Sequence, residues 1–129
     1  MKYLLPDGWE RPRGYSNGIV ADGKQVIVAG MIGWNEKEKM AQGFVAQFSL
    51  ALQNTMRVLA EADAGPEHVV RMTWYVTDKQ EYLANTKEIG VAYRAVMGRH
   101  FPAMALVQVV ALVEDRAKVE IETTAVILE

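Results

Sequence analysis

The sequence predicts an α+β fold in which one mixed sheet carries two helices on one of its faces. Two long segments, residues 41–63 and 79–98, have apolar side chains at three- and four-residue steps, which is typical of amphipathic helices. Shorter segments around them alternate or run apolar, as strands do, so the predicted order is β-β-α-β-α-β-β. Two helices can cover one face of such a sheet and not both. The chain has 129 residues and no linker, so we expect one domain over residues 1–129.

The N-terminal part is predicted to be an irregular lead-in followed by a β-hairpin. Residues 1–14 contain two prolines and two glycines, which argue against regular structure. Residues 15–21 and 24–32 read as strands, and Asp22-Gly23 between them favours a tight hairpin turn. Gly30 lies late in the second strand, where a glycine either lets a ligand or another backbone approach closely or simply ends the strand.

The helix over residues 41–63 should pack into the core, because its apolar residues form a single stripe. The stripe consists of Phe44, Phe48, Leu52, Met56 and Leu59, and the remainder is covered by Gln42, Gln47, Gln53, Arg57 and Glu61. Residues 68–78 then form a strand whose helix-facing side carries Val70, Met72, Trp74 and Val76. The other side of this strand, with Arg71 and Tyr75, is too polar for a core and too aromatic for open solvent.

The helix over residues 79–98 leads into two strands that are predicted to pair with each other antiparallel. Residues 103–112 include one polar side chain, Gln108, so this strand should be buried on both faces. A short charged turn, residues 113–116, should connect it to a strand over residues 119–126. That second strand alternates strictly and places Glu120 and Glu122 on one face. These carboxylates must meet solvent, a ligand or a basic group.

Composition excludes several classes of function. The formal net charge is −2, with 23% charged residues, so a nucleic-acid-binding or membrane-surface protein is not indicated. The absence of cysteine excludes disulfides and thiolate sites, and neither histidine has a partner at metal-ligand spacing, so we expect no metal and no cofactor. No run of about 18 apolar residues is present, and Pro6 and Gly8 interrupt the start of the chain, which makes a cytoplasmic protein the default expectation.

The sheet face that no helix covers is predicted to be partly apolar. In a single copy of the chain this face would be exposed to solvent. Burying it against copies of itself is the simplest remedy, so we expect a closed homo-oligomer.

The chain resembles the RidA/YjgF family of small imine and enamine deaminase-like proteins over nearly its whole length. The motifs stand in the family's order: Tyr15-Ser16, the stretch Ala29-Gly30-Met31-Ile32, residues 47–54 (QFSLALQN), residues 69–78 (VVRMTWYVTD), Phe101-Pro102-Ala103 and Val119-Glu120-Ile121-Glu122. The resemblance implies a chorismate-mutase-like α+β fold, a homotrimer and small-molecule clefts between subunits.

The resemblance also implies site residues, and at one position this sequence departs from the family. Deaminating members have an arginine after Phe-Pro-Ala that grips the substrate carboxylate, whereas this chain has Met104. Glu120 matches the carboxylate that positions the attacking water. The expected ligand cleft is lined by Tyr15, Gly30, Trp34, Met104 and Leu106, together with Glu120. Arg99 could turn inward to supply the missing cation, or it could form a solvated basic pair with His100 at a helix end.

Two classes of function follow and remain open. The first is an enzyme that hydrolyses an imine or enamine to a carbonyl compound and ammonia, on a non-standard substrate such as a 2-aminomuconate-like dienamine. The second is a protein that binds small metabolites without turnover and acts in regulation. In either case, Met104 predicts weak or absent activity on 2-aminoacrylate-type substrates, because a thioether cannot replace a charged bidentate contact.

Overall fold

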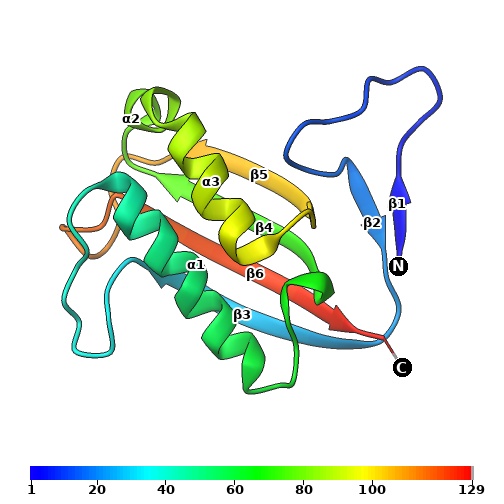
Figure 1. The fold of residues 1–129 in the computed structure, drawn as a ribbon, viewed down its shortest axis with the longest axis horizontal. Coiled ribbons are helices and arrows are strands. Elements are labelled where there is room, and N and C mark those ends of the chain that lie inside the picture. Colours follow the sequence, from blue (N-terminus) through cyan, green and yellow to red (C-terminus); the bar gives the residue numbers. More distant parts are fainter. Residues whose placement is uncertain (129) are drawn as a thin grey trace.

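The computed structural model describes residues 1–128 and contains a four-stranded mixed sheet, a separate two-stranded sheet and three α-helices (Figure 1). Glu129, the last residue of the expected domain, lies outside the described residues. In chain order the elements are β1 (Lys2–Leu4), β2 (Gly18–Val20), β3 (Lys24–Ile32), α1 (Phe44–Ala60), the 3₁₀ turn η1 (Pro66–His68), β4 (Val69–Val76), α2 (Lys79–Ala84), α3 (Thr86–Met97), β5 (Ala103–Gln108) and β6 (Val119–Ile127). Among residues 1–128, no helix is both long and apolar enough to cross a membrane.

The four-stranded sheet has the order β3-β6-β4-β5, and α1 and α3 lie across one of its faces (Figure 1). Strand β6 is antiparallel to both of its neighbours, whereas β4 and β5 are parallel. The helix-facing side chains of β6 are buried: Val119, Ile121, Thr123 and Ala125. The mixed sheet with two main helices confirms the predicted α+β fold.

The predicted pairing of the last two strands is wrong. Strand β5 pairs with β4, with one further isolated bridge from Ala103 to Ser16, and β6 lies between β3 and β4 on the far side of β4. As an edge strand, β5 is half exposed rather than buried on both faces, and it ends at Gln108 rather than at residue 112. Strand β6 takes the central place because its alternating pattern offers one continuous buried face and backbone groups that both neighbours can pair.

The predicted N-terminal hairpin is also wrong, since β2 pairs with β1 and not with β3. Strand β1 forms within residues 1–14, which we expected to be irregular. Figure 1 shows that the β1–β2 pair lies beside the main sheet. Gly23 has φ of +149°, and a Cβ there would lie 2.1 Å from the carbonyl oxygen of Ile127. The chain therefore passes tightly over the end of β6, and β3 pairs with β6 instead of folding back on β2.

Helix α1 buries the predicted stripe, with Met56 partly exposed, and it also buries two polar side chains, Gln47 and Thr55. Gln47, which we expected on the solvent side, is 3% exposed. Its amide nitrogen donates to the carbonyl oxygens of Ala41 and Arg116, and its amide oxygen accepts from the backbone N–H of Lys118. One buried amide therefore joins α1 to the segment that enters β6.

The second predicted helix is broken into α2 and α3 at Asn85. Asp78 starts α2, where its carboxylate accepts from the backbone N–H groups of Gln80 and Glu81. At Asn85 the backbone leaves helical geometry, and the Asn85 side chain donates to the carbonyl oxygen of Glu81. Helix α3 then ends at Gly98, with φ of +62°, as the sequence predicts.

An aromatic series connects the core to the edge of the sheet at β5. The rings of Phe48 and Trp74 lie 4.7 Å apart, those of Trp74 and Tyr93 6.0 Å apart, and those of Tyr93 and Phe101 5.6 Å apart. Phe48, Trp74 and Tyr93 are buried, whereas Phe101 is partly exposed. Three members of this series, Trp74, Tyr93 and Phe101, line the first cavity described below.

Candidate functional site

The first candidate cavity, here called the β5 groove, lies between α3, β5 and residues 13–15, with a volume of about 460 Å³. It contains three of the predicted ligand residues, namely Tyr15, Met104 and Leu106. Its inner wall comes from Trp74, Tyr93 and Phe101 of the aromatic series. The volume lies within the range of known small-molecule sites.

Strand register explains why Met104 and Leu106 face this groove. In the parallel β4–β5 pair, Met104 lies beside Met72 and Leu106 beside Trp74. Met72 and Trp74 are buried toward the helices, so their β5 neighbours project to the same side. Both also pack against the core cluster. The groove floor is therefore apolar at the position where the family resemblance implies an arginine.

The groove also contains polar groups that the sequence did not reveal. Arg13 and Arg94 line it, and the buried indole N–H of Trp74 finds no acceptor among residues 1–128. Burial raises the pKa of Tyr93 well above its ordinary value, and the hydroxyl of Tyr93 donates to the carbonyl oxygen of His100. Tyr93 therefore stays neutral and holds the turn before β5 in place.

The second cavity, here called the β3 pocket, contains the other half of the predicted site. It has a volume of about 360 Å³ and includes Gly30, Trp34 and Glu120. Glu120 lies on the face of β6 opposite the helices, in register with Ile32 of β3 and Tyr75 of β4. The carboxylate is thus reached from the uncovered face of the sheet.

The geometry at Gly30 explains why a glycine stands there. The β3–β6 register shifts between Val28 and Met31, which is a β-bulge, and Gly30 lies within it. A Cβ on Gly30 would lie 2.3 Å from Oε2 of Glu120. The missing side chain therefore leaves the space that the Glu120 carboxylate occupies, which favours the close-approach interpretation of this glycine.

Trp34 is held by two residues that sequence reasoning missed. The Asn54 amide nitrogen donates to the carbonyl oxygens of Ile32, at 3.0 Å, and Trp34, at 2.8 Å. The guanidinium carbon of Arg116 lies 6.0 Å from the centre of the Trp34 ring, at the outer limit of a cation–π contact. Asn54 closes the QFSLALQN motif, so its place in that motif was the available signal.

Other carboxylates near Glu120 are already engaged. Tyr75 donates to Glu122 at 2.8 Å, and this hydrogen bond is the main cause of a raised pKa at Tyr75. Glu114, which also lines the β3 pocket, accepts from Arg116 at 2.8 Å, and that contact lowers the Glu114 pKa. No hydrogen bond to the Glu120 carboxylate is formed within residues 1–128, so it is the carboxylate free to hold a water.

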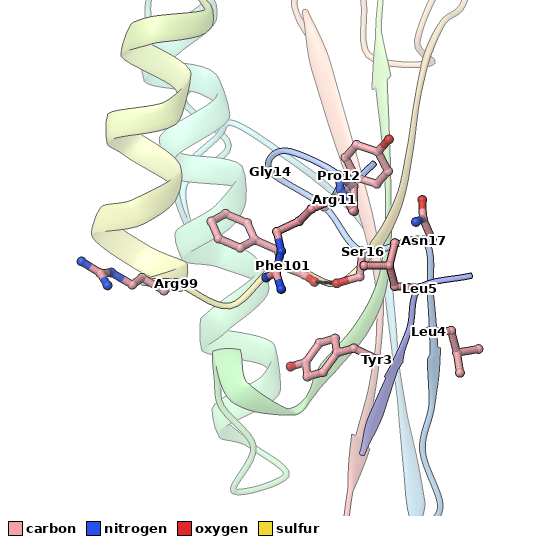
Figure 2. Close-up of a pocket in the computed structure, with 11 residues that line it drawn as sticks. Tyr3, Leu4, Leu5, Arg11, Pro12, Gly14, Ser16, Asn17, Arg99 and Phe101 are labelled. Carbon is pink, nitrogen blue, oxygen red and sulfur yellow. Dashed lines mark hydrogen bonds between the residues drawn. The ribbon is translucent and has the colours of Figure 1, made fainter. Parts of the chain in front are cut away.

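Arg99 and His100 have separate roles in the structure. Arg99 lies at a neighbouring pocket with Tyr3 and Arg11, and its guanidinium points away from the other labelled side chains (Figure 2). Within one chain it does not line the groove that contains Met104. His100 is half-buried: Nε2 contacts the Val69 carbonyl oxygen at 2.6 Å and Nδ1 contacts the Tyr3 hydroxyl at 3.1 Å, so it joins β1 to β4 rather than forming a solvated pair with Arg99.

One chain does not unite the predicted site residues. Tyr15, Met104 and Leu106 lie at the β5 edge, on the helix side of the sheet. Gly30 lies on the edge strand β3 and Trp34 just after it, whereas Glu120 projects from the neighbouring strand β6 on the sheet face opposite the helices. Strand β4 separates β6 from β5, so each cavity contains only part of the predicted set of ligand residues.

Comparison with known proteins identifies the family. The sequence profile described as Endoribonuclease L-PSP matches residues 10–127. The RutC family protein UK114 of Drosophila melanogaster is 33% identical over 113 residues, which cover 86% of this chain and 78% of that protein. Protein DfrA of Myxococcus xanthus is 37% identical over 119 residues, covering 87% and 84%.

A solved structure agrees with this assignment. The crystal structure of YyfB from Yersinia pestis, described as a protein of unknown function of the conserved Rid protein family, superposes with a TM-score of 0.85. It is 28% identical, and the match covers 98% of each chain. The chain therefore belongs to the endoribonuclease L-PSP family, the RidA/YjgF group that its sequence motifs indicate.

Proposed function

We propose that the chain forms a homotrimeric ring with a small-molecule cleft at each interface, built from the β5 groove of one subunit and the β3 pocket of the next. The observation that carries this proposal is the division of the predicted site between two separate cavities of one chain, with Met104 and Glu120 on opposite faces of the sheet. Two different surfaces that complement each other make a head-to-tail contact, and such contacts close into rings. The family resemblance supplies the number three.

The chemistry we propose is hydrolysis of an imine or enamine. Glu120 would hold a water against the C=N carbon and take a proton from it as the water oxygen bonds to that carbon and the C=N bond becomes single. Proton transfer to the nitrogen then lets the C–N bond break, and a carbonyl compound and ammonia leave. A carboxylate that accepts a proton from the water is suited to this step. Because Met104 offers no charge, the substrate we expect is larger than a short 2-imino acid.

Imine hydrolysis tests the proposal directly. An amino-acid oxidase would generate imines in situ from a panel of aromatic and aliphatic amino acids, and semicarbazide would trap them as semicarbazones. A smaller yield of semicarbazone in the presence of the protein would report hydrolysis of the imine. We expect hydrolysis by the wild type and at least a 100-fold loss in Glu120→Gln, within the range typical of a positioned acid or base. Equal rates in both proteins would remove Glu120 from the mechanism.

The second function, binding without turnover, is favoured by the apolar Met104 in the groove floor. It predicts that compounds which raise the melting temperature of the wild type also raise that of Glu120→Gln, with no chemical change in the compound. Conversion of any stabilising compound by the wild type would favour the enzyme instead.

Subunit sharing has a separate test. Glu120→Gln alters the β3 pocket, and Leu106→Trp would block the β5 groove. When the two variants are mixed and reassembled in equal amounts, each mixed trimer regains one intact cleft, so about a quarter of the wild-type sites should return. No recovery after proven subunit exchange would contradict a cleft shared between subunits.

A further inference from the structure

We propose that Arg94, assisted by Arg13, takes over the role of the missing strand arginine and binds the carboxylate of an acid with an aromatic or extended apolar body in the β5 groove. This inference rests on the proposed function, because the groove is one half of the proposed cleft. It assigns the cation to α3 and to the segment before β2, at positions to which the family resemblance assigns no role.

The charge in the groove has one sign. Arg13 and Arg94 line it, and no carboxylate of residues 1–128 does. Neither arginine takes part in any ion pair formed within that described part of the chain. Two unpaired cations over low-dielectric walls attract an anion more strongly than the same charges in open solvent.

The packing of Arg94 against α3 directs its charge to the groove. Gly90 lies one turn earlier in the interior of the helix, and it also lines the groove. A Cβ on Gly90 would lie 3.2 Å from Nη1 of Arg94, so the guanidinium folds back over the bare backbone of the preceding turn. Glycine weakens a helix interior relative to alanine. The space that it leaves here is the space in which the Arg94 guanidinium lies.

The remaining walls indicate the body of the ligand. Tyr15, Phe101, Met104 and Leu106 present aromatic and apolar surface, and burial raises the pKa of both Tyr82 and Tyr93 in the same wall. These hydroxyls therefore stay neutral and do not repel a carboxylate. Arg94 on α3 provides a cation at one side of the groove, and β5 provides an apolar surface at the other. This arrangement fits an acid whose carboxylate lies at the opposite end from the apolar body that packs on Met104.

Binding of a matched pair of probes tests the inference. Titration calorimetry would compare 3-phenylpropionate with its uncharged amide, 3-phenylpropanamide, on the wild type, Arg94→Gln, Arg94→Lys and Arg13→Gln. Arg99→Gln is the matched control, since Arg99 is also exposed near the end of α3 but lines a different pocket. A ¹³C-methyl label on methionine reports contact at Met104 independently of the arginines.

We expect the wild type to bind 3-phenylpropionate more tightly than the amide. The Arg94→Gln variant should bind the acid roughly 10- to 150-fold more weakly, which is the effect of losing one charge-assisted contact. Arg13→Gln should lower the affinity for the acid less than Arg94→Gln does, and Arg94→Lys should retain part of that affinity. Binding of the amide should be the same in all variants, and Arg99→Gln should bind the acid as the wild type does. Equal binding of acid and amide with a shifted Met104 signal would overturn the role of Arg94 while leaving the cleft intact. No binding of either probe, with Met104 unperturbed, would overturn both the inference and the proposed cleft.

Discussion

At the scale of single residues, position 104 is where the chain departs from the family pattern inside a cavity. Met104 lies on edge strand β5 beside Met72 and lines the β5 groove. A thioether packs well against an apolar ligand and offers no charged donor. The residue that most departs from the family pattern is therefore also one that the structure places in a cavity.

Met104→Arg should raise activity on short 2-imino acids, on which we expect the wild type to have little or none. The new guanidinium would supply a charge-assisted contact worth about 1.5–3 kcal/mol, so turnover at low substrate should rise by roughly 10- to 150-fold. Keto-acid release from oxidase-generated imines measures it, with Met104→Leu as the volume-matched control. Rapid turnover of such imines by the wild type would show that another cation already provides the contact.

Tyr93 provides a pH-dependent prediction. Its pKa is raised in the folded state, chiefly by burial, whereas the unfolded value is about 10. The neutral hydroxyl therefore contributes stability that is present below about pH 10 and is lost as the pH rises above it. Tyr93→Phe should be less stable at neutral pH, because the hydrogen bond to His100 is lost, and its stability should fall less steeply between pH 9 and 11. Urea unfolding at several pH values measures how the free energy of unfolding of each protein changes with pH. The same pH dependence in the wild type and in Tyr93→Phe would contradict a raised pKa at Tyr93.

At the scale of elements, two contacts set how α1 docks on the sheet. The end of β3 approaches the helix so closely that a Cβ on Gly33 would lie 2.4 Å from the Cα of Gln47. The Gln47 amide then joins the helix to the loops on either side. Because α1 also holds Trp34 through Asn54, these contacts connect helix docking to the β3 pocket.

Gly33→Ala and Gly90→Ala should have opposite effects on stability. At Gly33 the added methyl meets backbone, so α1 must shift, at a cost of about 1–3 kcal/mol. At Gly90 it meets only the mobile end of Arg94, so replacing a helix-interior glycine should stabilise by about 0.5–1 kcal/mol. Thermal unfolding of both variants gives the comparison. A Gly33→Ala protein as stable as the wild type would show that the contact relaxes without cost.

Gln47→Leu should destabilise the fold although it adds apolar surface to a buried site. It leaves the backbone N–H of Lys118 and two carbonyl oxygens without their partner, and a buried unsatisfied group costs about 1–3 kcal/mol. Gln53→Leu is the matched control on the same helix, where the side chain is exposed and a change within about 0.5 kcal/mol is expected. Equal denaturation midpoints for the two variants would mean that water replaces the Gln47 contacts.

At the scale of the whole molecule, the sheet face opposite the helices is the surface through which we propose that the chain assembles. Ile27 is 68% exposed and Val107 is 42% exposed, and both belong to strands of this sheet. Glu120, Glu122 and Tyr75 add polar groups on the same side, so the surface combines apolar area with two carboxylates, one of which accepts a hydrogen bond from Tyr75. Such a surface suits an interface between copies of the chain.

Ile27→Glu should convert the proposed trimer to smaller species. Light scattering of the wild type at micromolar concentration should give about three times 14.4 kDa, and the variant should approach 14.4 kDa because a charge would be buried without a partner. Val91→Glu, on an exposed position of α3, is the control and should keep the wild-type mass. A monomeric wild type would contradict both the trimer and the shared cleft.

Individual elements show how far sequence reasoning reached. The stripe of α1 and the alternation of residues 119–126 were predicted well, because each pattern depends on near neighbours in the chain. The predicted β-hairpin over residues 15–32 failed because β3 found a better partner in β6, and β1 formed in a stretch with too little pattern to predict it. Arg94 could not be recognised as a groove residue, since only the packing of α3 beside β5 brings it there.

The sequence by itself determined the α+β class, the buried stripe of α1, the alternating faces of β6 and, through its motifs, the family. These properties follow from periods of 2 and 3.6 residues and from short motifs, which are local in the chain. Only the tertiary structure decided the strand order β3-β6-β4-β5, and with it the placement of Met104 on edge strand β5 and of Glu120 on the opposite face of the central strand β6. Strand pairing is a competition between segments far apart in sequence that carry similar patterns. The outcome depends on which arrangement buries the most apolar surface while pairing the most backbone groups.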